Sequence, residues 1–374
     1  MPEVAEQVQP NQPQAPVGQN RLRSYRMGFI AFLLLHIPFF AYPILRICDL
    51  FDLSLITTTL IFIPCFFGPT FGWIYLRRRQ GEYLKYIRRG LSTWLGTSPL
   101  LLISLLIFEA INLISPLTNS TMALGVIGLT LCLVAFSFYG ALYPRIKTIK
   151  LTSSKLTKPL KFAQITDVHI GSRSKEFLSS IVKKINRLDP DFLCITGDFI
   201  DARNVGLEQL QSLREVKAPI YYVIGNHERY EDFDDILTRL GQLDFNILRN
   251  RSLTLETGIQ IIGIDDSDDH AYVANELDKL NIDDDKYVIL LFHRPRGFED
   301  AADRGVDLML CGHTHGGQIF PFNLIVRQVF DKVLGLFRHH DAHLYVSPGT
   351  GTWGPVMRFG TRSEISHFEI SPSS

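Results

Sequence analysis

The stretch VDLMLCGHTHGGQ, residues 306–318, places two histidines one residue apart directly after an apolar run. The run predicts a buried strand, and the glycines around His313 and His315 let the backbone turn sharply and approach other groups closely. Side chains two residues apart on an extended chain point to the same side. Both imidazoles can therefore reach one small object, and the rest of the sequence indicates what it is.

Six further apolar runs in the second half of the chain have the composition of buried strands. They are FAQIT (162–166), DFLCIT (191–196), IYYVI (220–224), IQIIGI (259–264), YVILLF (287–292) and LYV (344–346). Between the first two, a helix is predicted over 174–188, with one apolar face formed by Phe177, Ile181, Ile185 and Leu188. Alternating strands and helices followed by more strands predict an α/β sandwich.

Polar side chains that can bind metals follow five of these seven runs, always at the carboxyl end. Ligands bind at that edge in open α/β sheets. One histidine after a strand, or one Gly-Asp turn, is usually structural, but the joint occurrence favours a metal site. The residues, in chain order, are Asp167, His169, Asp198, Asn226, His227, His293, His313 and His315.

The chemistry of this set favours two divalent cations. Asp and Asn oxygens together with His nitrogens suit Mn²⁺, Fe²⁺ or Zn²⁺, whereas a Ca²⁺ or Mg²⁺ site needs more carboxylates. Two such ions about 3.5–4 Å apart can activate water and stabilise an in-line displacement at phosphorus. The sequence contains no GxxxxGK[ST] loop, serine elbow or catalytic-cysteine motif that competes for this role.

The motifs DVH, GDFID, GNHE, FH and GHTH, in this order, resemble those of the calcineurin-like metallophosphoesterase superfamily. The segments GHTHGGQ and YVSPGTGTWGPVMRF are similar to its membrane-associated bacterial branch, which includes UDP-2,3-diacylglucosamine pyrophosphatases. The resemblance covers residues 160–371. It implies a metal-dependent phosphoesterase whose β-sandwich is flanked by helices, in an αββα arrangement.

The resemblance also implies which residues bind which ion, with Asp198 bridging the two. The ligands of the first ion would be Asp167, His169, Asp198 and His315. The ligands of the second ion would be Asp198, Asn226, His293 and His313.

Five further residues of the motifs, or beside them, receive other interpretations. The resemblance implies that His227 is catalytic and not a ligand, and that it contacts the phosphoryl oxygen or protonates the leaving group. Asp201 and Glu228 are expected to support the site structurally. Arg173 and Arg294 are candidates for binding substrate phosphate.

Three segments outside the motifs are given structural roles. The acidic stretch DDSDDH (265–270) is expected to be a solvated face, and FRHHDAH (337–343) a solvated loop or strand edge. The glycine-rich segment 347–354 follows a strand and is expected to form a wall of the pocket.

The first half of the chain differs in composition from the second. Residues 21–161 contain 16 Lys or Arg and four acidic residues. Residues 162–374 contain 22 Lys or Arg and 32 acidic residues. Four apolar segments, at 27–47, 52–76, 95–117 and 121–143, each approach the roughly 20 residues that span a bilayer. We therefore predict a disordered tail (1–26), an all-α region of four transmembrane helices (27–143), a basic linker (144–160) and a catalytic domain (161–371).

Basic residues predict how these helices are oriented. They gather before the first span, between the second and third, and after the fourth, which places the catalytic domain in the cytoplasm at a multi-pass inner membrane. Five cysteines without CxxC spacing are typical of free thiols in a reducing compartment. Within the spans, His36 and Glu109 are the only candidate polar residues, which favours an anchor over a transporter.

The sequence thus predicts a membrane-anchored enzyme that cleaves a phosphodiester or pyrophosphate bond. Its position suggests a lipid-linked or nucleotide-lipid substrate, and the expected partners are this phosphoester and the lipid bilayer, with no nucleic acid. Three alternatives remain open: a phosphatase of soluble nucleotides or phosphoproteins, a non-catalytic membrane-tethered binding module, and a transporter or sensor whose spans are the functional unit.

Overall fold

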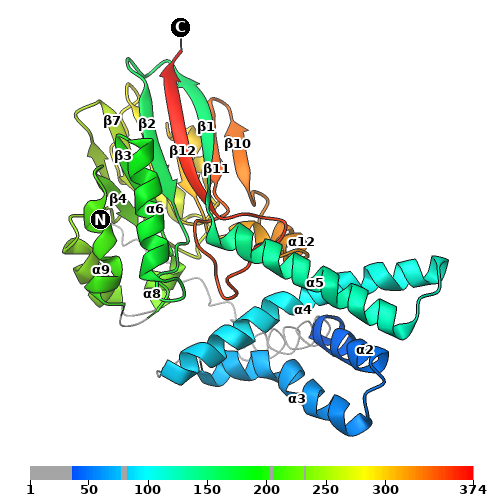
Figure 1. Ribbon diagram of the computed structural model, residues 1–374. Helices are drawn as coiled ribbons and strands as arrows, with labels where there is room; N and C mark the ends of the chain where they lie inside the picture. The colour runs from blue at the N-terminus through cyan, green and yellow to red at the C-terminus, as the bar shows by residue number, and fades with distance from the viewer. Residues whose placement is uncertain (1–35, 77–81, 203–204, 231–232, 374) are drawn as a thin grey trace, which may run out of the picture.

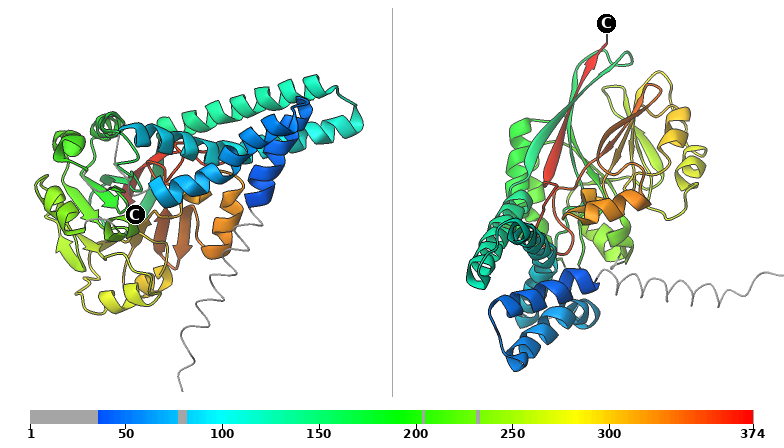
Figure 2. Two further views of the ribbon diagram at one scale, coloured as in Figure 1. Left: turned by 90° about the horizontal axis from the view of Figure 1, so that it is seen from below. Right: turned by 90° about the vertical axis from the view of Figure 1, so that its right-hand side faces the viewer.

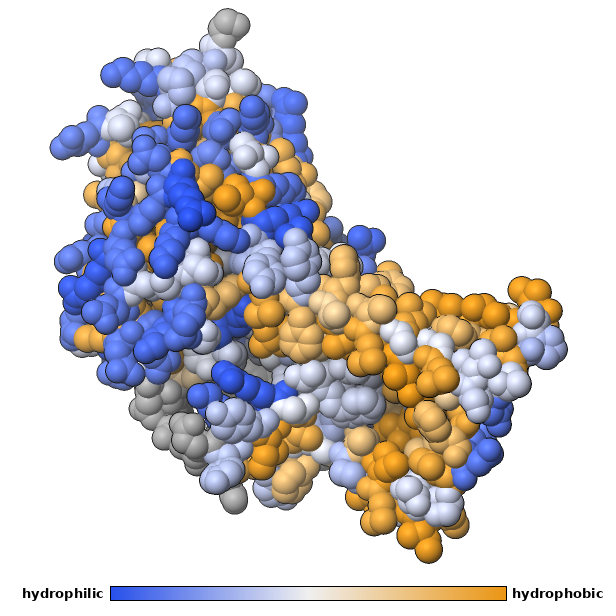
Figure 3. All heavy atoms as spheres, viewed as in Figure 1, coloured by the Kyte–Doolittle hydropathy of each residue, from blue (hydrophilic) through white to orange (hydrophobic). Residues whose placement is uncertain are grey.

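The computed structural model describes residues 36–76, 82–202, 205–230 and 233–373. A group of long helices projects from an α/β body, with the two parts in direct contact (Figure 1). The described helices of the first part are η1 (Ile37–Ala41), α2 (Tyr42–Leu50), α3 (Leu55–Phe71), η2 (Gly72–Leu76), α4 (Glu82–Ile114) and α5 (Asn119–Leu142). Apolar side chains gather on the surface of this part, and polar ones on the α/β body (Figure 3).

Among the described residues of the first part, two helices are long and apolar enough to cross a membrane. They are Tyr83–Ile114 and Asn119–Leu142, while Leu55–Phe71 is apolar but shorter. Two spans are therefore supported by length and composition, and the four-span topology stays a prediction. The predicted tail and the beginning of the first predicted span lie outside the described residues.

The two polar residues predicted within the spans both contact neighbouring helices. Glu109 lies 2.6 Å from Nε of Arg46, and Nε2 of His36 lies 2.8 Å from the carbonyl oxygen of Phe66. These contacts hold neighbouring helices together, so both residues have a structural role.

The α/β body contains two six-stranded sheets. The first has the order β1-β12-β2-β3-β4-β5, and the second β10-β11-β9-β8-β7-β6. Strands β2 to β5 are parallel, as are β7, β8, β9 and β11. The strands are β1 (Arg145–Ser153), β2 (Leu160–Ile165), β3 (Phe192–Thr196), β4 (Ile220–Val223), β5 (Asn246–Ile247), β6 (Arg251–Thr254), β7 (Ile259–Gly263), β8 (Tyr287–Leu291), β9 (Leu308–Cys311), β10 (Gly335–His339), β11 (Ala342–Val346) and β12 (Glu364–Pro372).

The sheets pack face to face, and helices cover their outer faces. Phe162 and Phe192 of the first sheet share one buried cluster with Ile289 and Leu310 of the second. Separate clusters join α6 and α9 to the first sheet, and α10 and α11 to the second. All seven predicted strands are present and the predicted α/β sandwich is confirmed. The helices are α6 (Lys175–Leu188), α7 (Leu207–Leu210), η3 (Gln211–Glu215), α8 (Asn226–Tyr230), α9 (Phe233–Gly241), α10 (Tyr272–Leu277), α11 (Phe298–Asp303), η4 (His315–Gly317) and α12 (Phe322–Val329).

Helix α6 shows how local sequence produces these elements. The side chain of Ser174 accepts a hydrogen bond from the backbone N–H of Phe177 and caps the helix. Ile181 and Ile185 of the predicted apolar face are fully buried against the first sheet. The helix ends at Asp189, whose φ of 48° is left-handed.

The segment predicted as a basic linker is largely a strand. Strand β1 pairs in parallel with β12 over nine residues. Ile149 and Leu151 are buried in the core between the sheets, while Lys150 between them is exposed. Alternation of apolar and polar residues over 148–152 explains the buried part of this strand. The six positive charges over 144–161 had suggested a linker.

Helix α5 is bound to the α/β body through its last turns. The carbonyl oxygens of Ser137 and Gly140 accept the backbone N–H groups of Arg358 (2.9 Å) and Ser363 (3.0 Å). The carbonyl of Ala141 accepts Nη2 of Arg173 at 3.3 Å. These bonds tie the helical part directly to the segment 358–363 and to Arg173 of the body.

Candidate metal centre

The predicted ligands lie where the strands of both sheets end. Asp167 and His169 follow β2, Asp198 follows β3, and Asn226 begins α8 after β4. From the second sheet, His293 follows β8, and His313 and His315 follow β9. Because the sheets pack with these ends adjacent, side chains from both meet at one edge.

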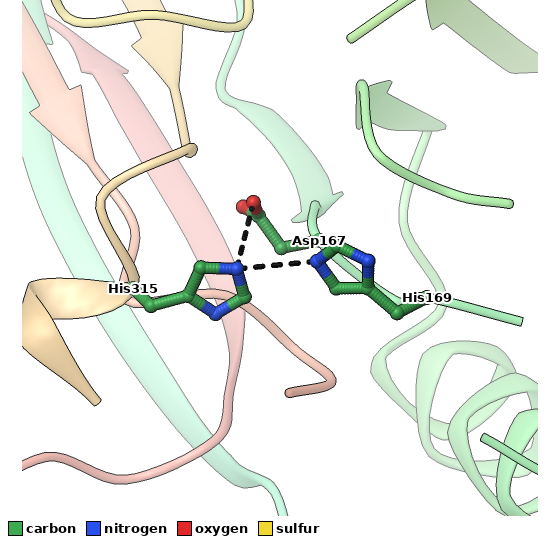
Figure 4. A group of neighbouring side chains, drawn as sticks. All are labelled: Asp167, His169 and His315. Atoms are coloured by element: carbon green, nitrogen blue, oxygen red, sulfur yellow. Dashed lines mark hydrogen bonds and ion pairs between the residues drawn. The ribbon is translucent and has the colours of Figure 1, made fainter. Parts of the chain in front are cut away.

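One group of three side chains consists of Asp167, His169 and His315, all buried (Figure 4). Nε2 of His315 lies 3.2 Å from Nε2 of His169 and 3.3 Å from Oδ1 of Asp167. The potential ligand atoms all lie within 4.8 Å of one another. Such a group can hold one cation.

A second group consists of Asp198, His293 and His313, again with ligand atoms within 4.8 Å of one another. Nε2 of His293 lies 3.1 Å from Oδ2 of Asp198 and 3.2 Å from Nδ1 of His313. Nδ1 of His293 is 2.8 Å from the carbonyl oxygen of Thr196, which can only accept, so Nδ1 carries a proton. The lone pair of neutral His293 is therefore on Nε2, inside the group.

The donor atoms fit a pair of divalent ions. Oδ1 of Asn226 is buried without a hydrogen-bond partner, and buried polar atoms rarely lack one. Nδ1 of His169 lies 3.4 Å from Oδ2 of Asp201, so Nε2 of His169 is the nitrogen that faces the first group. Facing imidazole nitrogens 3.2 Å apart, beside carboxylates, form a donor set suited to Mn²⁺, Fe²⁺ or Zn²⁺. The assignment of each residue to one ion stays a prediction.

The backbone at these residues is strained. Five of the seven predicted ligands have a positive φ: Asp167 (51°), His169 (56°), Asp198 (49°), His313 (71°) and His315 (50°). This conformation costs a non-glycine residue roughly 1–2 kcal/mol, and such residues cluster at functional sites. The fold therefore maintains this arrangement at a cost in stability.

Glycines allow the motifs to pack against one another. A Cβ on Gly312 would lie 2.2 Å from Oδ2 of Asp167, and a Cβ on Gly225 would lie 2.2 Å from Oδ1 of Asp198. The backbone N–H of His313 also donates to Oδ2 of Asp167 at 3.1 Å. The GHTH segment thus helps to position the DVH segment as well as contributing histidines.

Glu228 organises the loop that carries Asp198. Its buried carboxylate accepts four backbone N–H groups, from Asp198 (3.0 Å), Phe199 (2.6 Å), Ile200 (2.9 Å) and Gly225 (2.8 Å). Burial raises the pKa of Glu228 to about 7, and the neighbouring Asp198 adds to the shift. Glu228 therefore has the structural role that its motif position predicted.

Arg358 supports the other side of the site and was missed in the sequence. It is fully buried, with its guanidinium 3.1 Å from the carbonyl oxygen of His315 and 2.9 Å from that of Gly351. Burial lowers the pKa of Arg358 to about 9. A single arginine within the apolar segment VMRF gave no periodic signal by which to recognise this role.

Electrostatics differ between the histidines. Burial lowers the pKa of His313 and of His315 well below the ordinary value, and a neighbouring histidine lowers each further. Burial also opposes charge on His293, but Asp198 and Asp167 outweigh it and raise the pKa of His293 to about 10. For Asp198, burial is outweighed by His293, His227 and His169, which hold its pKa well below the usual range. Asp198 therefore stays ionised at the junction of the two groups.

His227 lies at the opening of the site. Its Nε2 is 3.9 Å from Oδ2 of Asp198, and its ring is 4.8 Å from that of His169. Burial lowers the pKa of His227, although Asp198 opposes the shift. The ring of Trp353, 57% exposed, lies 6.5 Å away on the outer side. The segment 347–354 therefore borders His227, and Trp353 is a site residue that the sequence did not single out.

The two arginines proposed for phosphate binding have protein partners instead. Arg294 pairs with Asp266 at 2.7 Å and Asp268 at 2.6 Å. Arg173 is directed at Ala141 and lies over the ring of Phe177 at 3.7 Å.

The acidic stretch 265–270 is only partly the solvated face that the sequence predicts: Asp268, Asp269 and His270 are exposed. Asp265 and Asp266 are buried and not solvated, because arginines distant in sequence neutralise them. Arg249 lies 2.6 Å from Asp265, and Arg229 and Arg294 contact Asp266. No local pattern in the sequence indicated these partners.

The histidines of 337–343 lie away from both groups. His339 ends β10, with its Nε2 3.4 Å from Oδ1 of Asp303, and His340 beside it is exposed. Their position on a strand end and turn agrees with the structural role predicted for them.

Comparisons with known proteins identify the family. Residues 160–317 match the model of the calcineurin-like phosphoesterases. An uncharacterized metallophosphoesterase of Helicobacter pylori (strain J99) is 35% identical over 268 residues, which cover 66% of this chain and 70% of that protein. An uncharacterized metallophosphoesterase of Aquifex aeolicus is 35% identical over 237 residues, which cover 60% of this chain and 90% of that protein. A transmembrane protein with metallophosphoesterase domain from Danio rerio is 30% identical over 258 residues, which cover 61% of this chain and 57% of that protein. The chain therefore belongs to the calcineurin-like phosphoesterases, and it is a metal-dependent phosphoric ester hydrolase.

Proposed function

We propose that this enzyme is anchored in the inner membrane by its N-terminal helices and hydrolyses a phosphodiester or pyrophosphate bond on the cytoplasmic side. The bond belongs to a lipid-linked or nucleotide-lipid substrate. The observation that carries the hydrolytic part is the meeting of two acid–histidine groups at one edge of the sandwich. Two divalent ions, Mn²⁺, Fe²⁺ or Zn²⁺, would supply Lewis acidity at the phosphoryl oxygens.

The residues around the ion sites have separate tasks in this proposal. Asp198 belongs to the second group, and its backbone carbonyl accepts the N–H of His169 of the first at 3.1 Å, so its ionised carboxylate is suited to bridge two cations. His227 is not needed as a ligand and remains partly accessible, with 22% of its side chain exposed. Since burial keeps its imidazole neutral, His227 can donate a hydrogen bond to a phosphoryl oxygen.

The membrane part of the proposal rests on the helical part and its attachment. Two apolar helices have the length of membrane spans, and α5 is hydrogen-bonded to the segment that precedes β12. A Cβ on Gly96 of α4 would meet Pro355 and Met357, which follow Trp353 closely in the chain. A membrane around these helices would therefore lie close to the entrance of the site, which favours a substrate held in the bilayer.

Three variants separate metal binding from catalysis. Asp198→Asn and His313→Ala are expected to lose bound Mn²⁺ and all measurable hydrolysis of bis-p-nitrophenyl phosphate, because the first removes the negative charge of the second group and the other removes one of its donors. His227→Ala is expected to keep the metal and lose about 10²–10⁴-fold in rate. The control is His270→Ala, at an exposed histidine away from the motifs.

Metal content by mass spectrometry and hydrolysis rates are measured on the same samples. Wild-type metal content together with wild-type rates in Asp198→Asn and His313→Ala would overturn the two-ion site. Loss of metal in His227→Ala would instead make His227 a ligand. Comparing phospholipids, UDP-linked lipids and soluble nucleotides as substrates then tests the substrate class.

A further inference from the structure

Helix α12 begins five residues after the GHTHGG segment and presents an apolar face that the described part of the chain does not cover. It has no buried residue. Leu324 is 50% exposed, Ile325 42% and Val329 61%, and Phe320, just before the helix, is 37% exposed. We call these four residues the α12 surface. Soluble surfaces rarely gather large apolar side chains in this way.

The α12 surface is continuous with the apolar helices. The ring of Phe322 lies 5.7 Å from that of Phe39, just before α2. Phe322 also packs with Leu100 of α4 and Ile319 in one apolar cluster. In both views of Figure 2, α12 lies beside the N-terminal helices. A membrane that surrounds these helices would therefore reach α12.

The same helix is attached closely to the metal centre. A Cβ on Gly317 would lie 2.2 Å from Cα of Asn323, so the GHTHGG backbone packs directly on the start of α12. At the other end, the ring of Phe330 lies 5.4 Å from that of His313. The hydroxyl of Thr314 donates to the carbonyl of Val333 at 2.6 Å. The helix therefore lies between the apolar helices and one of the predicted ligands.

We propose that the α12 surface inserts into the boundary between head groups and acyl chains of the membrane that holds the N-terminal helices. Its composition fits an interfacial helix, because Arg327 can extend its charge to the head groups while its neighbours are buried in lipid. The substrate phosphoester would then reach the ions from the bilayer, past Phe330. This inference rests on the proposed membrane anchoring and adds a second site of contact with the lipid.

Photo-crosslinking tests this inference on the full chain. The protein is reconstituted into vesicles of phosphatidylethanolamine and phosphatidylglycerol (3:1) with p-benzoylphenylalanine in place of Ile325, and separately of Val329. Leu106, exposed on α4 within a predicted span, is the positive control. Leu253, exposed on the edge strand β6, is the negative control. Melting midpoints that match the wild type show that each variant is folded.

The inference predicts a mass increase of one phospholipid after illumination at positions 325 and 329, with a yield near that at 106 and well above that at 253. Adducts at 106 without adducts at 325 or 329 would overturn the α12 proposal and leave the anchoring intact. An adduct of either position with a second copy of the chain would also overturn it, because another protein then covers the surface. If position 106 also gives no phospholipid adduct, the membrane anchoring itself is overturned.

Discussion

The Glu228 carboxylate offers the sharpest test of how the metal loops are held. In Glu228→Gln one oxygen remains an acceptor, but the amide nitrogen faces two of the four backbone N–H groups now bound. At a pH above the Glu228 pKa of about 7, two hydrogen bonds to a charged group are lost, at about 1.5–3 kcal/mol each, so the free energy of unfolding should fall by about 3–6 kcal/mol. Folded domains are stable by only about 5–15 kcal/mol.

The thermal consequence is measurable. For a body of this size 1 kcal/mol shifts the midpoint by about 2–4 °C, so a fall of roughly 6–24 °C is expected. The assay is tryptophan fluorescence of the full chain in detergent during heating at one fixed rate. Glu256→Gln, the same change at an exposed turn residue, is the control and should melt within about 2 °C of wild type, because exposed substitutions rarely exceed about 0.5 kcal/mol.

Bound metal gives an independent readout of the same loop. Because Glu228 holds the backbone N–H of Asp198, the variant should also bind Mn²⁺ more weakly in an equilibrium titration. A Glu228→Gln protein that melts with the wild type and binds Mn²⁺ equally well would refute the claim that this carboxylate organises the loop.

Two further predictions follow from packing. Gly312→Ala should lower hydrolysis by about 100-fold or more, since a Cβ 2.2 Å from Oδ2 of Asp167 must displace that carboxylate and a 1 Å displacement costs about this much. Gly241→Ala, where a Cβ meets nothing within 4 Å, should leave the rate unchanged. A shortened chain that begins at residue 160 lacks β1 and exposes the edge of β12, so it should be less soluble and melt lower than a chain beginning at 144. Equal melting midpoints would contradict a structural role for β1.

The order of strands and the residues that follow them could be predicted because both depend on local patterns. Apolar runs of four to six residues indicate buried strands, and parallel strands bring their carboxyl ends together. That rule places Asp167 and Asp198 at one edge of the first sheet. His293 follows a strand of the second sheet and joins them because the two sheets pack with these ends adjacent. Strand β1 gives no such signal, because its three apolar residues alternate irregularly with three basic ones.

The roles that could not be predicted from the sequence depend on contacts between residues far apart in the chain. Arg358 acts on His315, 43 residues away in the chain, and Arg249 neutralises Asp265. Glu228 was expected to be structural, but its four N–H partners depend on how two loops meet. Local propensity carries no information about such partners, because only the folded arrangement of the sheets brings them together.

The contacts of Arg358 bear on why the helices and the site belong to one chain. Its backbone N–H is bound by Ser137 near the end of α5, while its side chain holds the carbonyl of His315. One residue thus connects an apolar helix with a predicted metal ligand. Movement of α5 relative to the body would break these bonds or carry His315 with it. A long flexible tether would give the enzyme proximity to a membrane, but these bonds fix the position of the metal centre relative to the helices. Such a fixed position is of use when the bond to be cleaved also lies at a fixed depth, as it does in a substrate anchored in the bilayer.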